Sequence, residues 1–220
     1  MNNISSYFIL IHCSLCLLIA CTPTESTSPN TTSTTTKTDN TKMEEAKANT
    51  VEEKVAAIRN LYKNIQDNLG KYTNKHKSYA SDLEVPIVGE LTAFMDGSRI
   101  VKLVDKAEED HGPSVNEYFF INSKLFFLFS QVTTVEMTEK PNSHVRELRL
   151  YFDEGQIIDA LVKTKTFKHG ETIDMSTVAN EKGTSLIGAE EEAEYYTQLA
   201  SETLEFFESK ESFDEFYGGE

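Results

Sequence analysis

The sequence predicts an α+β domain in which an N-terminal helix packs on an antiparallel β-meander of about six strands, arranged as three hairpins, with an acidic helix at the C-terminal end. Three observations lead to this fold class: a strand–turn–strand pattern that occurs three times in succession, an amphipathic helical pattern before it, and an acidic helical pattern after it. Of the 220 residues, a leader and a polar segment occupy the start, and the remaining 49–217 have the length of one domain.

The central hairpin is predicted at 117–135, where two apolar runs flank Asn122-Ser123. An Asn followed by Ser between β-branched and aromatic residues is typical of a tight primed turn, in which Asn accepts a positive φ. A half-exposed strand would alternate apolar and polar residues, whereas the phenylalanines here fall on both parities. We therefore expect both faces of this hairpin to be covered. The phenylalanines proposed to contact a ligand or partner are Phe119, Phe120, Phe126 and Phe127.

Hairpins of the same pattern are predicted at 90–104 and 145–164, with turns at Asp96-Gly97 and Asp153-Glu154-Gly155. Gly in these turns adopts a left-handed backbone conformation without a steric penalty. Sequential strands usually lie side by side, which predicts the six-strand meander. Each copy begins with a Glu, and these three like charges would need cationic neighbours across the sheet. The acidic residues and the proposed partners are Glu90, Glu117 and Glu147, with Lys102, Arg149 and Lys163.

A helix is predicted at 50–69. Thr50 and Glu53 form a capping box, apolar residues then recur at three- and four-residue spacing, and Gly70 suits the end of the helix. Its expected role is to cover one face of the sheet. Residues 72–85 are polar and irregular in pattern, and we interpret them as the connection to the first strand.

A second, acidic helix is predicted at 189–216. From Gly188 onward there are ten Glu and Asp214 against Lys210, so most of the chain's net charge of −15 lies here. Such a helix would either present a solvated face or steer a basic partner. Its net charge makes the chain a poor candidate for binding nucleic acid.

The first twenty residues indicate export. An apolar run at 7–20 ends in Leu18-Ile19-Ala20-Cys21, which resembles the lipobox of bacterial lipoproteins, although residues 1–6 lack Lys and Arg. The run of about 14 residues is short for a membrane span of roughly 20, and an ordinary signal peptide cut elsewhere is the other alternative.

The resemblance implies cleavage of a signal peptide at 1–20 and attachment of diacylglycerol and an acyl chain such as palmitate to Cys21. It also implies a bilayer partner, a place in the bacterial cell envelope and, because Thr22 is not the Asp that some bacteria use for inner-membrane retention, the outer membrane. Cleavage would remove Cys13 and Cys16, so the mature domain would have no internal disulfide. The Ser/Thr-rich residues 21–48 are predicted to form a disordered tether. The repeated units at 50–165 also resemble uncharacterised envelope lipoproteins that join a helix to a β-meander, which implies no activity.

The sequence offers little chemistry. No catalytic motif, cofactor fingerprint or transition-metal spacing occurs. Asp105, Glu108 and Asp110 are a weak Ca²⁺ candidate that matches no EF-hand loop, and a solvated loop is the favoured interpretation.

The preferred functional hypothesis is a non-enzymatic, membrane-anchored module that meets a protein partner in the envelope through a sheet edge or the acidic helix. The alternative is a carrier or sensor of an apolar ligand in a pocket lined by the Phe-rich sheet face. An envelope hydrolase is the least favoured hypothesis, because it would need a perturbed carboxylate or His in a cleft.

Overall fold

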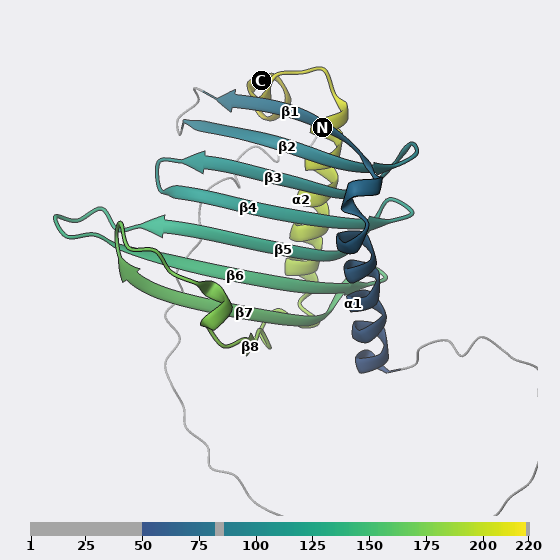
Figure 1. Ribbon diagram of the computed structural model, residues 1–220, viewed down its shortest axis with the longest axis horizontal. Coiled ribbons are helices and arrows are strands. Elements are labelled where there is room, and N and C mark those ends of the chain that lie inside the picture. The colour runs from purple at the N-terminus through teal and green to yellow at the C-terminus, as the bar shows by residue number, and fades with distance from the viewer. Residues whose placement is uncertain (1–49, 82–85, 219–220) are drawn as a thin grey trace, which may run out of the picture. The chain divides into compact units, whose positions relative to one another are not determined.

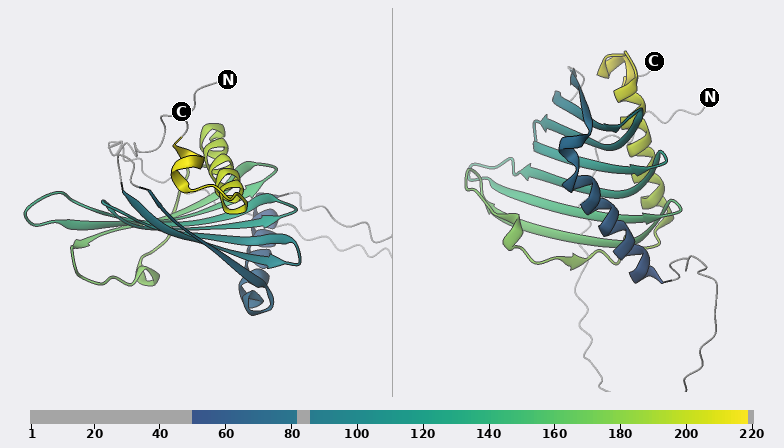
Figure 2. Two further views of the ribbon diagram at one scale, coloured as in Figure 1. Left: turned by 90° about the horizontal axis from the view of Figure 1, so that it is seen from above. Right: turned by 45° about the vertical axis from the view of Figure 1, so that its right-hand side comes forward.

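The computed structural model describes residues 50–81 and 86–218, and the predicted leader, Cys21 and the tether lie outside these ranges. The described residues form one antiparallel sheet with helices on both of its faces, which confirms the α+β class (Figure 1). Seen along the sheet, α1 lies on one side and α2 and α3 lie on the other (Figure 2).

The sheet has eight strands in chain order, so each strand pairs with its neighbours in sequence. The prediction of six strands was wrong by two: β1 occupies the segment interpreted as a polar connection, and β8 lies in the connection after the third hairpin. Neither has the apolar run that marks a strand in sequence, because both lie at edges of the sheet. The strands are β1 (Thr73–Ser81), β2 (Ile87–Asp96), β3 (Arg99–Glu109), β4 (Gly112–Ile121), β5 (Lys124–Val135), β6 (Asn142–Asp153), β7 (Gln156–Lys168) and β8 (Glu181–Lys182).

The three predicted hairpins are confirmed as β2–β3, β4–β5 and β6–β7. The two strands of each hairpin are joined by a two-residue turn. In each hairpin the pairing register shifts just before the last two residue pairs ahead of the turn. Asn122 and Ser123 both have positive φ, as a type I′ turn requires, and so do Glu154 and Gly155. The two-residue turn and the register shift therefore occur in all three hairpins, whereas the paired positive φ values occur only in β4–β5 and β6–β7, because in the β2–β3 turn only Gly97 has a positive φ.

Helix α1 (Val51–Asp67) begins at the predicted capping box. The Glu53 N–H donates to Thr50 Oγ1 and the Thr50 N–H donates to Glu53 Oε2, each over 3.2 Å. The helix ends at Asp67, two residues before the predicted end, and a 3-10 turn, η1 (Leu69–Lys71), turns the chain toward β1.

The predicted acidic helix is two helices, α2 (Glu190–Glu208) and α3 (Phe213–Tyr217). The break has a local cause: Ser212 and Glu215 form a second capping box, which starts α3 in a new direction. A further 3-10 turn, η2 (Met175–Thr177), lies in the connection between β7 and β8.

Two apolar layers flank the sheet. On one face, α1 packs on Phe119, Phe126 and Phe127, and Tyr62 of α1 makes edge contacts with two of these rings. On the other face, α2 and α3 pack on Phe120 and a larger group of aliphatic residues. The expectation that both faces of the central hairpin are covered is confirmed. Burying one Phe side chain contributes about 1.5–3 kcal/mol, so these layers are a main source of stability.

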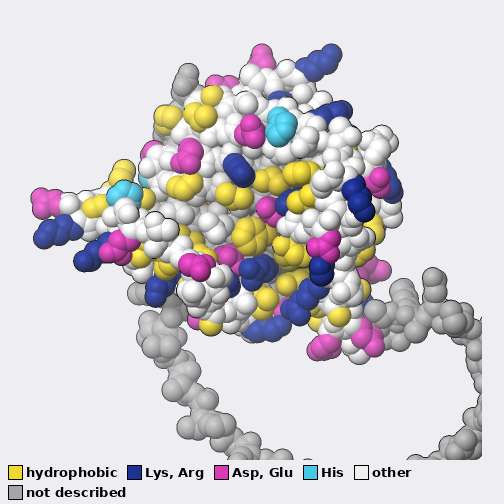
Figure 3. Space-filling model, viewed as in Figure 1, with side chains coloured by type: hydrophobic (Ala, Val, Ile, Leu, Met, Phe, Trp, Pro, Cys, Tyr) yellow, Lys and Arg dark blue, Asp and Glu magenta, His cyan; other side chains and the backbone are white. Residues whose placement is uncertain are grey.

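Buried ion pairs lie on the α1 side of the sheet. Lys102 Nζ is 2.9 Å from Glu117 Oε2, and Glu147 Oε1 is 2.5 Å from Arg149 and 3.5 Å from Lys163. The predicted cationic partners of two of the three repeated glutamates are thus confirmed. On the same face, hydrophobic side chains remain visible between charged ones in the space between α1 and the β7–β8 connection (Figure 3).

Candidate functional site

Strand β1 is an edge strand. All of its nine residues pair with β2, from Thr73 opposite Met95 to Ser81 opposite Ile87, and within the described ranges no strand pairs with its other side. An edge of this kind presents a row of backbone N–H and C=O groups, which is a template for a further strand.

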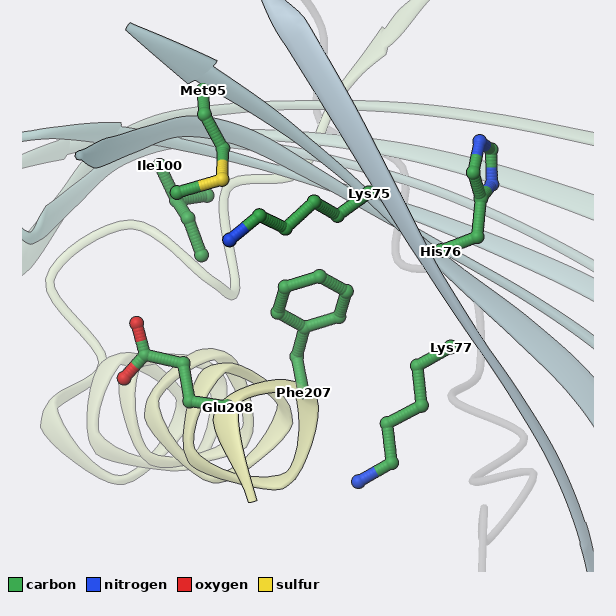
Figure 4. Close-up of a pocket in the computed structure, with 7 residues that line it drawn as sticks. All are labelled: Lys75, His76, Lys77, Met95, Ile100, Phe207 and Glu208. Atoms are coloured by element: carbon green, nitrogen blue, oxygen red, sulfur yellow. The ribbon is translucent and has the colours of Figure 1, made fainter. Parts of the chain in front are cut away.

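This edge is basic in an otherwise acidic chain. Lys75, His76 and Lys77, which we call the basic edge, are the third to fifth residues of β1, and residues 68–81 contain no Asp or Glu. Glu90 of β2 lies 3.6 Å from the His76 ring. Lys75 and Lys77 point to the side of α2, whereas His76 points to the opposite side of the strand (Figure 4). The two faces of β1 therefore both carry basic side chains.

Lys77 ties β1 to the end of α2. Its Nζ donates to the backbone oxygen of Phe206 over 2.5 Å, to that of Ser209 over 3.2 Å and to Ser209 Oγ over 3.1 Å, and it lies 3.7 Å from the centre of the Phe206 ring. The carbonyl end of a helix carries partial negative charge, which a cation stabilises. Burial lowers the pKa of the Lys77 ammonium. Lys77 is therefore a structural residue as well as a basic one.

Lys75 is exposed and, among the described residues, forms no ion pair. It borders a hollow of about 300 Å³ between the β1–β2 edge and the last turn of α2. Figure 4 shows its ammonium beside an apolar wall and on the same side of the hollow as a single carboxylate. The residues that line the hollow are Lys75, His76, Lys77, Met95, Ile100, Phe207 and Glu208. A cation beside apolar side chains can hold a chain that carries both a carboxylate and an apolar group.

A second titratable cluster lies deeper, under α2 and α3. The Tyr79 hydroxyl donates to Asp105 Oδ1 over 2.6 Å, and burial raises the pKa of Asp105 to about 6. Burial also raises the pKa values of the surrounding tyrosines, Tyr79, Tyr118 and Tyr217. A buried carboxyl with a raised pKa is a feature of acid–base sites. However, Asp105 lines neither the hollow beside Lys75 nor the hollow at the β4–β5 turn. The cluster acts as a buried hydrogen-bonded network.

The residues of the weak Ca²⁺ candidate do not form a metal site. Asp105 faces the α2 side and accepts from Tyr79, whereas Glu108 is exposed and Asp110 lies 3.4 Å from His111 in the turn after β3. Within residues 50–81 and 86–218, no three His, Cys, Asp or Glu side chains are grouped closely enough to hold a metal ion.

The four phenylalanines predicted to face a ligand or partner are core residues, each no more than 6% exposed. Phe120 and Phe126 also border a hollow of about 210 Å³ beside the Asn122-Ser123 turn. The basic edge was missed by sequence reasoning. Its signal is present, however, since Lys75-His76-Lys77 is a run of three consecutive basic residues in a chain of net charge −15.

Comparison of the chain with family models, curated proteins and solved structures gave no match. None of the helices in the described part of the chain has both the length and the apolar character of a bilayer-spanning helix.

Proposed function

We propose that the chain is a lipid-anchored protein of the bacterial cell envelope, at the outer membrane, and that its folded domain is a non-enzymatic module that binds a protein partner. The anchor is supported by the lipobox-like Leu18-Ile19-Ala20-Cys21. The binding role is carried by one observation: β1 is a nine-residue strand that, among the described residues, is paired on one side only, and its third residue is the exposed Lys75.

The anchor is tested by labelling cells that express the chain with radioactive palmitate. Label should enter the wild-type protein and be lost in Cys21→Ser. Cys13→Ser and Cys16→Ser are matched controls, because both cysteines precede the proposed cleavage site, and both variants should keep the label. Label that persists in Cys21→Ser contradicts the proposed anchor.

The binding role is tested by placing a photo-crosslinking amino acid at position 75 in β1 and, as a matched control, at position 165 in β7. Both positions carry exposed lysines on strands. A discrete crosslinked product in intact envelopes is expected from position 75 and not from position 165. Absence of any product from position 75 would count against a role for this edge.

The ligand-carrier alternative has less support. Its pocket was to be lined by Phe119, Phe120, Phe126 and Phe127, which are buried under α1 and α2. The hollow that two of them border is about 210 Å³, below the roughly 300–1,000 Å³ of small-molecule sites. The hydrolase hypothesis is favoured by the raised pKa of the Asp105 carboxyl, but one oxygen of this carboxyl already accepts a hydrogen bond from Tyr79.

A further inference from the structure

We propose that the basic edge binds an extended, acidic segment of a partner protein, which pairs with β1 as an additional strand. This inference rests on the proposed binding role and adds the chemistry and conformation of the partner.

The backbone of β1 fixes the conformation of the occupant. Its nine residues match a strand of ordinary length, and within residues 50–81 and 86–218 no strand pairs with it on the side away from β2. In strand addition, the main-chain hydrogen bonds supply affinity, and the side chains that face each other choose the partner.

Charge determines the composition of the occupant. Residues 68–81 carry Lys71, Lys75, His76 and Lys77 without any acidic residue, although the whole chain has a net charge of −15. Opposite charges that face each other across strands stabilise pairing, whereas like charges oppose it. A segment with carboxylates at alternate positions would place them beside Lys75 on the side of the hollow.

The hollow adds a requirement for an apolar group. Met95, Ile100 and Phe207 line it next to Lys75, so a Leu that replaces one carboxylate on the same face of the added strand would lie beside these side chains. Glu208, on the same side of the hollow as the Lys75 ammonium, would repel a second carboxylate placed deep inside. The favoured occupant therefore mixes acidic and aliphatic residues.

A second copy of the chain is a poorer occupant. Antiparallel pairing of β1 with itself centred on His76 would bring Lys75 opposite Lys77 and the two His76 opposite one another, and pairing centred on Lys77 would bring the two Lys77 together. The two domains, each strongly negative, would also repel. Lysines on an edge strand are a known device against such self-pairing.

The experiment measures binding of the fluorescein-labelled peptide Glu-Val-Leu-Val-Glu-Val-Glu, in which Leu and Glu share one face of the strand, to the purified full-length protein by anisotropy. Binding that weakens with added salt is expected, together with slower amide hydrogen exchange in residues 73–81. Lys75→Glu should weaken binding at least tenfold, and Lys165→Glu, which changes an exposed lysine of β7, should leave it unchanged. The variants should have the same circular dichroism as the wild type.

Two peptide controls sharpen the result. The counterpart with Lys in place of each Glu should not bind, and replacement of the central Val by Pro should abolish binding, since Pro cannot complete a ladder. Equal binding of the Pro peptide overturns strand addition. Protection of residues 73–81 that rises with protein concentration without peptide shows a second copy as the occupant and also overturns the proposal. If no peptide binds while crosslinking at position 75 succeeds, the proposal of an acidic, extended occupant is wrong, and the proposal that this edge binds a protein partner stands.

Discussion

The Tyr79 side chain lies over Gly89, its direct partner on the neighbouring strand, so closely that a Cβ atom at position 89 would overlap the ring. This contact places the Tyr79 hydroxyl on Asp105 and its ring against Phe213, stacked at 5.1 Å. One glycine in β2 therefore allows β1, the buried carboxyl and α3 to meet.

Gly89→Ala should lower the free energy of unfolding by about 1–3 kcal/mol, the usual cost of overpacking. The ring of Tyr79 would have to move and would lose its contacts with Asp105 and Phe213. Gly70→Ala is the control, because no atom lies within 4 Å of a Cβ built there. Urea denaturation measures both variants, and similar values for the two would refute the role of this contact.

Asp105 should make stability depend on pH. Burial raises its pKa to about 6, above the ordinary 3.8, so the folded state holds the proton to higher pH than the unfolded state. Its contribution to stability therefore falls as pH rises from about 4 to about 6 and stays low above that, a loss of up to roughly 3 kcal/mol.

Asp105→Asn removes this penalty while its amide oxygen still accepts from Tyr79. We expect the variant to be more stable than the wild type by about 1–3 kcal/mol at pH 8 and nearly equal to it at pH 4. Denaturation at the two pH values measures the difference, and comparison with the wild type cancels the contribution of Glu109, whose pKa burial also raises. A gain that is the same at both pH values contradicts the assignment.

Lys77→Met should loosen the C-terminal end of α2. The variant loses the cation that binds the carbonyl oxygens of Phe206 and Ser209, at an expected cost of about 1 kcal/mol. Hydrogen exchange should become faster in the last turn of α2 and in α3. Lys75→Met, which removes an exposed lysine without an ion pair, should leave both measurements unchanged.

Glu147→Gln should destabilise the domain by about 3 kcal/mol, because it leaves the Lys163 charge buried without its anion. Among the described residues Glu147 Oε1 makes no hydrogen bond of good geometry, so its stabilisation comes from the nearby cations. Replacing Glu147 by Leu and Lys163 by Met together should recover most of the loss.

The matched control is Asp67→Asn, which breaks the exposed Lys63–Asp67 pair on α1 and should cost less than about 0.5 kcal/mol. Thermal or urea denaturation of the set gives the comparison. A small effect of Glu147→Gln would mean that Lys163 is held by its bond to the Met175 backbone oxygen alone.

Ser123→Gly should stabilise the β4–β5 turn by about 1 kcal/mol, since Ser123 has a φ of 62°, which is costly for a residue with a Cβ. Ser98, in the same turn position of the β2–β3 hairpin, does not have a positive φ. Ser98→Gly should therefore bring no gain. Equal gains in the two turns, measured by urea denaturation, would contradict this explanation.

The elements that were predicted correctly have strong local signals. Apolar runs separated by Asn-Ser, Asp-Gly or Glu-Gly mark the three hairpins, and Thr50 with Glu53 marks the start of α1. β1 was missed because its only large apolar side chain is Tyr79, and a polar edge strand has no periodic pattern of its own. The break between α2 and α3 was missed although Ser212 and Glu215 carry its capping box.

By itself the sequence determined the hairpins, their turns, the two helical regions and the cationic partners of Glu117 and Glu147, because each depends on residues near in sequence or on a repeated pattern. Only the tertiary structure decided that Phe119 and Phe120 lie under different helices, that Tyr79 donates to Asp105, and that Lys75 stands at an open edge. These arrangements depend on which segments, distant in sequence, pack on the same face of the sheet. Local secondary-structure propensity does not determine which segments pack together.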